Sequence, residues 1–477
     1  MEFPLFGLGL QSKSPAVTAA KRINCYYEEQ KDKDKSKLVC FGTPGLKLFQ
    51  GTLGANPSRG MWPMGNFLYS VHGNTLYQIN NAGVATSVGT LTTMSGDVSL
   101  SDNNTQLALV DGTNIYIFNT STLVFTTKTG GVGGVPSSPT TITFLDQYFI
   151  VHQALTRNFW ISALNDGTSW SAANGGVTES GSGSLQAVIA DRSVIVLFGD
   201  FYTEFWQDTG GVDFPFARIP GSSQEFGLAA TFSLAKFGES ICGLFRSRMG
   251  AVAVARIRGF SLEKLSDPDM DNILNGYIRN GIGLGDAQGY AFHLDGHPMY
   301  VIGFPAAGTT WMYDGLSHIW SQLQATDGTR HWGAKFASFL NNELIVSDFR
   351  NANMYRIDPG TFTDNGSSIP LELWSRRIWS DNKWITIPEL EIFLEVGVGA
   401  ASGQGSTPRI MFSVSKDGGN TFGPERFLDM GALGNFTARA RTTRLGRGQD
   451  WVMKLRITDP VKRVLIGERL EVEVGST

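Results

Sequence analysis

The sequence predicts an all-β protein in which a β-propeller of about six to seven blades is inserted into an antiparallel β platform or sandwich built from both ends of the chain. Three observations lead to this prediction. Short strand pairs recur through the middle of the chain, glycine is abundant at 57 of 477 residues, and the strands lengthen after residue 360. Abundant glycine indicates many turns, and short strands at a regular period are typical of a propeller.

The repeated unit is an apolar strand, a short polar or glycine-bearing turn, and a second strand that carries aromatic residues. Successive units begin between 39 and 59 residues apart. β-branched and aromatic residues favour strands. A ring of such units can bury the faces that one unit alone cannot. The seven units that follow this pattern are 66–79, 105–118, 147–161, 193–206, 239–257, 298–314 and 342–358.

One helix is predicted, in the longest interval between units. Its sequence is SDPDMDNILNGYIRN, residues 266–280, with apolar residues at a helical period. Ser266 or Asp267 can cap the helix, and Pro268 suits its first turn. Gly281 follows the helix as a natural stop.

The repeat pattern ends near residue 360, where we place a domain boundary. Residues 371–399 contain longer strands, and with the segments that follow they predict a set of long antiparallel strands, as in a sandwich or platform. Residues 1–60 also differ from the repeats and include a charged run at 31–37, predicted to be a solvated loop. We therefore expect a propeller over 61–359 and a platform in which 1–60 packs with 360–477.

The charge is modest and unevenly spread. The net charge of −4 argues against a protein that grips nucleic acid through phosphates. Residues 1–60 carry 9 Lys and Arg against 5 Asp and Glu, and residues 360–477 carry 15 against 14. The middle segment therefore holds 15 basic and 24 acidic residues, a net charge of −9. The 3 cysteines lack metal-ligand spacing, no apolar stretch is long enough for a membrane span, and we predict no cofactor.

One turn raises the question of enzyme activity. SVSKDGGNTF, residues 413–422, is close to the Asp-box of sialidase propellers, NDGTSW (165–170) is a weaker match, and RIP (218–220) resembles the arginine motif of those enzymes. The order of these motifs along the chain differs from that in sialidases. An Asp-Gly-Gly turn also has a purely structural use, because Asp bonds the backbone two residues on and Gly accepts positive φ. We therefore predict that the turn folds a hairpin and that the protein is not an enzyme.

A row of arginines marks a candidate contact surface. Arg439, Arg441, Arg444 and Arg447 alternate along a predicted strand and into a turn. They form either a solvated, internally paired face or a basic surface for an acidic partner. The closely spaced His293 and His297 flank a turn instead of sharing a helix face, so we predict no metal site there.

Several stretches together resemble a phage protein family. RINCYYEEQ near the start, SVIVLFGDFYTEFWQDTGG and FSLEKLSDPDMDNIL in the middle, and TTRLGRGQDWVMKLRITDPVKRVLIGERLEVEV at the end carry the resemblance. They are similar to the packaged-DNA stabilisation proteins, or tail nozzle and tail hub proteins, of short-tailed phages such as P22. The likeness covers most of the chain.

The resemblance implies a structural protein of the virion tail, made in the bacterial host cytoplasm. It implies a homo-hexameric ring below the portal and adaptor, through which DNA passes without sequence-specific binding. A tail needle, spikes or fibres would attach to this ring. Our own hypothesis is that the basic 1–60 segment or the four arginines contact the adaptor. Two alternatives stay open at this point: a sialidase-like enzyme, and a propeller module that binds a glycan or host receptor.

Overall fold

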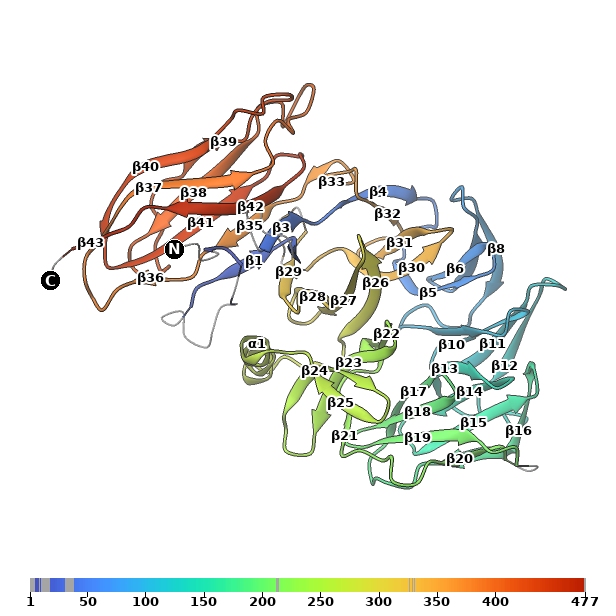
Figure 1. Ribbon diagram of the computed structural model, residues 1–477. Coiled ribbons are helices and arrows are strands. Elements are labelled where there is room, and N and C mark those ends of the chain that lie inside the picture. Colours follow the sequence, from blue (N-terminus) through green and yellow to red (C-terminus); the bar gives the residue numbers. More distant parts are fainter. Residues whose placement is uncertain are drawn as a thin grey trace.

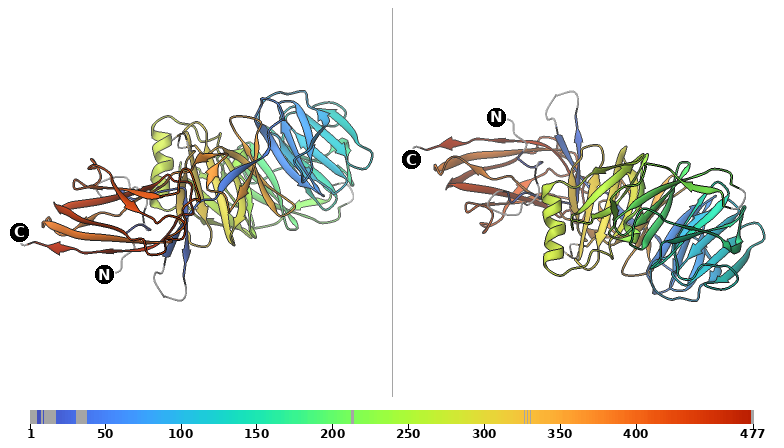
Figure 2. Two further views of the ribbon diagram at one scale, coloured as in Figure 1. Left: turned by 90° about the horizontal axis from the view of Figure 1, so that it is seen from above. Right: turned by 90° about the horizontal axis from the view of Figure 1, so that it is seen from below.

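The computed structural model describes residues 5–7, 9, 18–30, 38–211, 214–325, 327, 329 and 331–475. The charged run at 31–37, predicted to be a solvated loop, lies outside the described residues. The chain forms an elongated molecule with a seven-bladed propeller at one end and a two-sheet sandwich at the other (Figures 1 and 2). The predicted all-β fold class is thereby confirmed, with a blade number at the upper end of the predicted range.

The first four blades are four-stranded antiparallel sheets in simple chain order. Blade one contains β5 (Ser58–Met64), β6 (Phe67–His72), β7 (Thr75–Ile79) and β8 (Ala85–Thr90), and blade two contains β9 (Ser99–Asp102), β10 (Gln106–Val110), β11 (Asn114–Asn119) and β12 (Val124–Thr129). Blade three contains β13 (Pro139–Leu145), β14 (Tyr148–Gln153), β15 (Asn158–Ala163) and β16 (Asp166–Val177), and blade four contains β17 (Leu185–Asp191), β18 (Val194–Gly199), β19 (Thr203–Asp208) and β20 (Phe216–Arg218).

The last three blades depart from this simple pattern. In blade five, η1 (Thr231–Ser233) divides the first strand into β21 (Phe226–Leu228) and β22 (Ala235–Phe237), which both pair with β23 (Ser240–Ser247) before β24 (Val252–Arg258) and β25 (Ser261–Lys264). Blade six contains β26 (Gln288–Leu294), β27 (His297–Phe304), β28 (Thr309–Asp314) and β29 (Trp320–Leu323). Blade seven contains β30 (Ala334–Leu340), β31 (Glu343–Asp348) and β32 (Met354–Asp358), and β4 (Gly45–Gln50) adds its fourth strand.

This fourth strand corrects the predicted role of residues 1–60. We expected the whole segment to belong to the platform, but β4 pairs antiparallel with β32 and so joins the end of the propeller to its beginning. The first strands of blades seven and one, β30 and β5, also lie side by side. Lys335 on β30 strengthens this closure, because its ammonium group lies 2.5 Å from Asp97 and 3.2 Å from the carbonyl oxygen of Ser58. The ring is therefore closed by a strand from before the propeller.

The predicted helix is present as α1 (Pro268–Arg279), between blades five and six. Asp267 caps it by accepting a hydrogen bond from the Met270 backbone N–H, and Gly281 adopts φ +74° just beyond its end. Met270 and Leu274 are buried against the propeller, whereas Ile278 is exposed. The amphipathic spacing in the sequence thus places one face of the helix in the core.

The sandwich consists of two antiparallel sheets formed by both ends of the chain. The first contains β1 (Lys21–Ile23), β35 (Leu371–Trp374), β41 (Asp450–Ile457), β38 (Arg409–Ser415) and β39 (Arg426–Asp429), with β36 (Ile378–Trp379) also paired to β41. The second contains β2 (Cys25–Glu29), β3 (Leu38–Gly42), β42 (Val464–Leu470), β37 (Ile385–Leu394) and β40 (Ala440–Gly448), with β43 (Glu473–Val474) also paired to β37.

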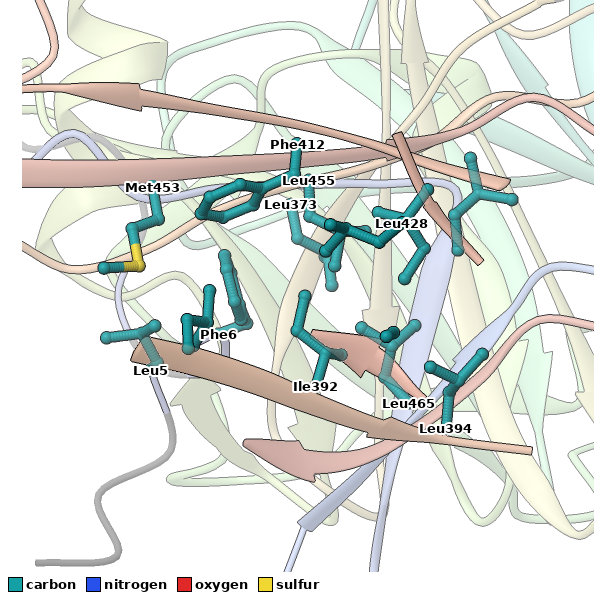
Figure 3. Close-up of a cluster of buried hydrophobic side chains, with 14 of the residues drawn as sticks. Leu5, Phe6, Leu373, Ile392, Leu394, Phe412, Leu428, Met453, Leu455 and Leu465 are labelled. Atoms are coloured by element: carbon teal, nitrogen blue, oxygen red, sulfur yellow. The ribbon is translucent and has the colours of Figure 1, made fainter. Parts of the chain in front are cut away.

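Alternating apolar residues of the two sheets meet in one core. Phe412 and Leu455 of the first sheet face Ile392 and Leu465 of the second (Figure 3). Leu5 and Phe6 from the amino-terminal segment enter the same core from one side (Figure 3). The Leu5 backbone N–H donates a hydrogen bond to Glu468, an inward-facing carboxyl whose burial raises its pKa to about 7.

The propeller and sandwich share backbone pairing. Strand β1 pairs in parallel with β29 of blade six and antiparallel with β35 of the sandwich, so one sheet runs from one domain into the other. The hairpin of β33 (Thr363–Asp364) and β34 (Ser367–Ser368) likewise pairs with β4 of blade seven. These pairings tie the sandwich to two neighbouring blades.

Buried polar side chains complete this junction. Asn24, 1% exposed and at φ +55°, donates from Nδ2 to the Pro370 carbonyl oxygen at 2.9 Å and accepts from the Gln324 N–H at 2.9 Å. Arg463 donates to the carbonyl oxygens of Ile369 at 2.5 Å and Thr43 at 2.8 Å. Each side chain therefore bridges chain segments far apart in the sequence and provides a hydrogen-bond partner for backbone groups at the junction.

Candidate interaction surface on the sandwich

The four predicted arginines lie along one outer face of the sandwich. Arg441, Arg444 and Arg447 are on β40 and Arg439 immediately precedes it, and all four side chains are exposed. β40 is the last strand of the second sheet and pairs on one side only, with β37. The structure thus brings the four residues together on one surface, as the alternating sequence predicts.

An irregularity in β40 separates the four arginines into two pairs. Pro388 lies within β37 and has no N–H to donate to β40, and the pairing register shifts between Ile387 and Glu389. On the opposite strand Arg444 adopts φ +56°, a left-handed conformation that a β-bulge accommodates. Arg439 and Arg441 lie on one side of the bulge, and Arg447 lies on the other.

The first pair is neutralised within the sheet. Arg439 forms a bidentate ion pair with Glu391, with N···O distances of 2.6 and 2.8 Å. Arg441 pairs with Glu389, and Arg469 from β42 lies 3.1 Å from Glu389 and 3.5 Å from Glu391. Hydrogen bonds from Arg439 hold the pKa of Glu391 below its usual value. The internally paired interpretation therefore accounts for Arg439 and Arg441.

The second pair has no such partner. Within the described ranges, neither Arg444 nor Arg447 forms an ion pair with a carboxylate. The Arg447 guanidinium lies over the Trp384 ring at 4.7 Å from its centroid, and Trp384 is 41% exposed. Arg426 of β39 donates to the Thr443 carbonyl oxygen at 2.8 Å and so covers part of the free edge of β40.

Sequence reasoning did not single out Trp384, although it completes this surface. It lies between the end of β36 and the start of β37, in the segment WSDNKW that crosses from one sheet to the other. Asp381 and Asn382 have φ +43° and +58°, as in a tight turn. The sequence SDN at residues 380–382, which favours a turn, was the available signal.

The Asp-box turn at 413–422 is a structural device. Asp417 accepts hydrogen bonds from the Ser415 hydroxyl at 2.5 Å, the Thr421 hydroxyl at 2.6 Å and the Thr421 backbone N–H at 2.9 Å. These bonds hold the pKa of Asp417 well below its usual range. Phe422 packs edge-on against Trp374 at 4.7 Å. The Asp417 carboxylate and the Ser415 and Thr421 hydroxyl groups thus fix the connection between β38 and β39.

The other residues considered for catalysis or metal binding are also dispersed. Arg218 on β20 pairs with Glu179 at 2.9 Å and donates to Ser223 at 3.1 Å. His297 is buried and bonds Asp314 at 2.9 Å, whereas His293 is exposed on the neighbouring strand. Among the described residues no group of three His, Cys, Asp or Glu side chains is arranged to hold a metal ion.

A cavity of about 360 Å³ lies between blades two and three. Its walls are formed by residues 127–129, 132, 133, 135 and 168–170. They include Lys128 and Trp170 but no Asp or Glu, whereas glycoside hydrolysis commonly uses a pair of carboxyl groups. In the part of the chain that the structure describes, no helix has the length and apolar character needed to cross a membrane.

Comparison with known families assigns both domains. A family model described as the β-propeller of bacteriophage P22 Gp10 matches residues 1–362, and one described as the β-sandwich of the same protein matches residues 370–474. The chain belongs to the bacteriophage P22 Gp10 family. The family relationship predicted from the sequence is thereby confirmed, and it identifies a structural protein of a phage.

Other similarities are remote. None of the curated protein sequences matches this member of the Gp10 family. The computationally designed Ika8 protein is 14% identical over 71% of this chain and 100% of its own, with a TM-score of 0.39. The N-terminal domain of Nup159 is 10% identical over 71% and 98%, with a TM-score of 0.40. The extracellular domain of BT4673 from B. thetaiotaomicron is 8% identical over 83% and 48%, with a TM-score of 0.43. Scores this low do not establish a common fold.

Proposed function

We propose that this chain is the tail nozzle or hub protein of a short-tailed phage. It forms a six-fold ring below the portal and adaptor, retains packaged DNA and conducts it out through the lumen at ejection. A tail needle, spikes or fibres attach to the ring. The observation that carries this proposal is the match of the Gp10 propeller and sandwich models, in order, to residues 1–362 and 370–474.

The charge distribution supports a conduit. Each phosphate–cation contact adds affinity for DNA, so a channel that releases DNA must avoid a basic wall. The segment 61–359 has 24 acidic against 15 basic residues, and its propeller contributes most of the mass of the chain. A ring of such subunits repels the duplex and stays soluble.

The rigid junction supports a ring subunit with two distinct contact surfaces. A ring closes through head-to-tail contacts between unlike faces of neighbouring copies. The sheet shared by β29, β1 and β35 keeps the propeller and the sandwich in fixed relative positions. We assign attachment to the adaptor to the outer sandwich face that carries Arg439, Arg441, Arg444 and Arg447.

The test uses phage particles assembled without this chain. We expect such particles to package DNA and then lose it, and purified protein added before release to restore retention, measured as DNA per unit of head protein. Particles that lack the chain but keep their DNA and remain infectious would contradict the proposal.

A further inference from the structure

Unpaired positive charge and exposed aromatic surface coincide at one end of the sandwich. Arg447 and Arg444 are exposed without a carboxylate partner among the described residues, and Trp384 lies directly beneath Arg447. Trp and Arg are the residues most enriched in the energetic centres of protein interfaces.

Ion pairing decides which arginines are available. Arg439, Arg441 and Arg469 surround Glu389 and Glu391, whose side chains are only 9% and 7% exposed. A partner would have to break these charge-assisted bonds to use the three arginines, and breaking them leaves two covered carboxylates unpaired. Arg444 and Arg447 can be engaged without that cost.

This part of the surface is open to a large partner. The segment that contains Trp384 joins β36 to β37, and Figure 1 places β36 and β43 at the end of the sandwich remote from the propeller. Figure 2 shows the same end projecting from the molecule in both views. Among the described residues, no strand of the propeller lies at this end (Figure 1).

We propose that Trp384, Arg447 and Arg444 form a docking site for a carboxylate-rich segment of another protein. The guanidinium of Arg447 lies over the indole at 4.7 Å from its centroid, and the exposed Arg444, three residues earlier on β40, supplies a second cation. An Asp or Glu side chain of the partner bonds the guanidinium groups, and an apolar neighbour of that residue covers the exposed part of Trp384. This site rests on the proposed function, since it specifies the contact through which the sandwich attaches.

The surface fits an acidic protein segment better than DNA. DNA binding uses many phosphate contacts and needs a broad basic field. Here the cations are few, and Glu471 and Glu473 are exposed on the opposite side of β37. A short acidic segment can contact the arginines and avoid these carboxylates, whereas a long polyanion meets both.

The experiment measures attachment of purified protein to phage heads assembled without it, by co-sedimentation across a concentration series. The double charge reversal Arg444→Glu with Arg447→Glu should weaken attachment at least about tenfold, and Trp384→Ala should have an effect of similar size. Attachment of the unaltered protein should weaken as the salt concentration rises. Two matched controls should attach normally: Arg248→Glu, a charge reversal on an exposed propeller loop, and Phe339→Ala, which removes a 42% exposed aromatic side chain from β30 of blade seven.

Each outcome has a distinct meaning. If all variants attach like the unaltered protein, the docking site is wrong while the proposed function stands. If even the unaltered protein fails to attach to the heads, the proposed function itself is contradicted. If the unaltered protein binds a DNA duplex and the same double charge reversal abolishes this binding, the site binds nucleic acid and the proposal is overturned. Thermal melting of each variant separates loss of docking from loss of folding.

Discussion

Replacing Asn24 is predicted to loosen the junction between propeller and sandwich. This residue lies between β1 and β2 and is almost completely buried. Its side chain donates to the carbonyl oxygens of Gln324 at 3.2 Å and Pro370 at 2.9 Å, and accepts from the Gln324 N–H at 2.9 Å. Its backbone N–H also donates to Gln322 in the outer strand of blade six. One residue thus joins blade six to the strand that follows Pro370.

The size of the effect follows from these bonds. Asn24→Ala leaves one donor and two acceptors at the junction without partners, and each buried unsatisfied group costs about 1–3 kcal/mol. The left-handed backbone at φ +55° adds about 1 kcal/mol, because Ala tolerates that region less well than Asn. Because two of the three bonds are only partly buried, we take about 1 kcal/mol, the lower end of that range, for each unsatisfied group. With the backbone contribution, we expect a loss of about 3–5 kcal/mol in the free energy of unfolding. Asn24→Gly loses the same bonds but not the backbone term, so it should be about 1 kcal/mol less destabilising.

Calorimetry and urea unfolding monitored by two probes measure the effect. The unaltered chain should unfold in one transition, because the shared sheet couples its domains, whereas Asn24→Ala should unfold earlier and in two resolved steps. A loss below about 1 kcal/mol, or equal destabilisation by the Ala and Gly substitutions, would refute this account of the junction.

Two further predictions concern single carboxyl groups. Asp417→Ala should lower the free energy of unfolding by about 1–2 kcal/mol, because the turn loses the hydrogen bonds that Asp417 accepts. Attachment to phage heads should stay unchanged. Loss of attachment in a folded variant would contradict a purely structural role. Burial raises the pKa values of Glu468 and Asp364 to about 7. Because folding favours the neutral forms, the stability they contribute is present in acid and is lost as the pH rises through their folded pKa values. Burial lowers the pKa values of His72 and His152 to about 4 and about 3, so these two groups oppose the trend by favouring the unfolded state in acid. The test therefore compares Glu468→Gln with the unaltered protein in urea unfolding. The stability of the variant relative to the unaltered protein should rise from pH 5 to pH 8, and an unchanged difference would place the responsible group elsewhere.

The sequence predicts the central strands of the propeller and misses others for a physical reason. The seven predicted strand pairs coincide with the second and third strands of the seven blades, which are more buried than the outer strands and therefore more apolar. The outer strands β8 and β12 are mostly exposed and polar, so their composition resembles that of a loop. Strand β4 could not be placed, because its partner β32 lies about 300 residues later and the pairing depends on closure of the whole ring.

The candidate surface was likewise predicted only in part. Alternation along 439–447 predicts exposed arginines, and their exposure is observed. Which of them remain unpaired depends on Glu389 and Glu391, about 50 residues earlier, and on the register between β37 and β40. Pro388 within a strand was a readable signal for the bulge that separates the two pairs.

Counting copies of this chain in purified phage particles, relative to the portal protein, tests the proposed function most directly. Quantitative mass spectrometry with labelled reference peptides provides the ratio. A six-fold nozzle on a twelve-fold portal predicts a ratio near one to two. Absence of the chain from particles, or a ratio that matches trimeric spikes, would contradict the nozzle and return attention to binding or enzymatic roles for the propeller.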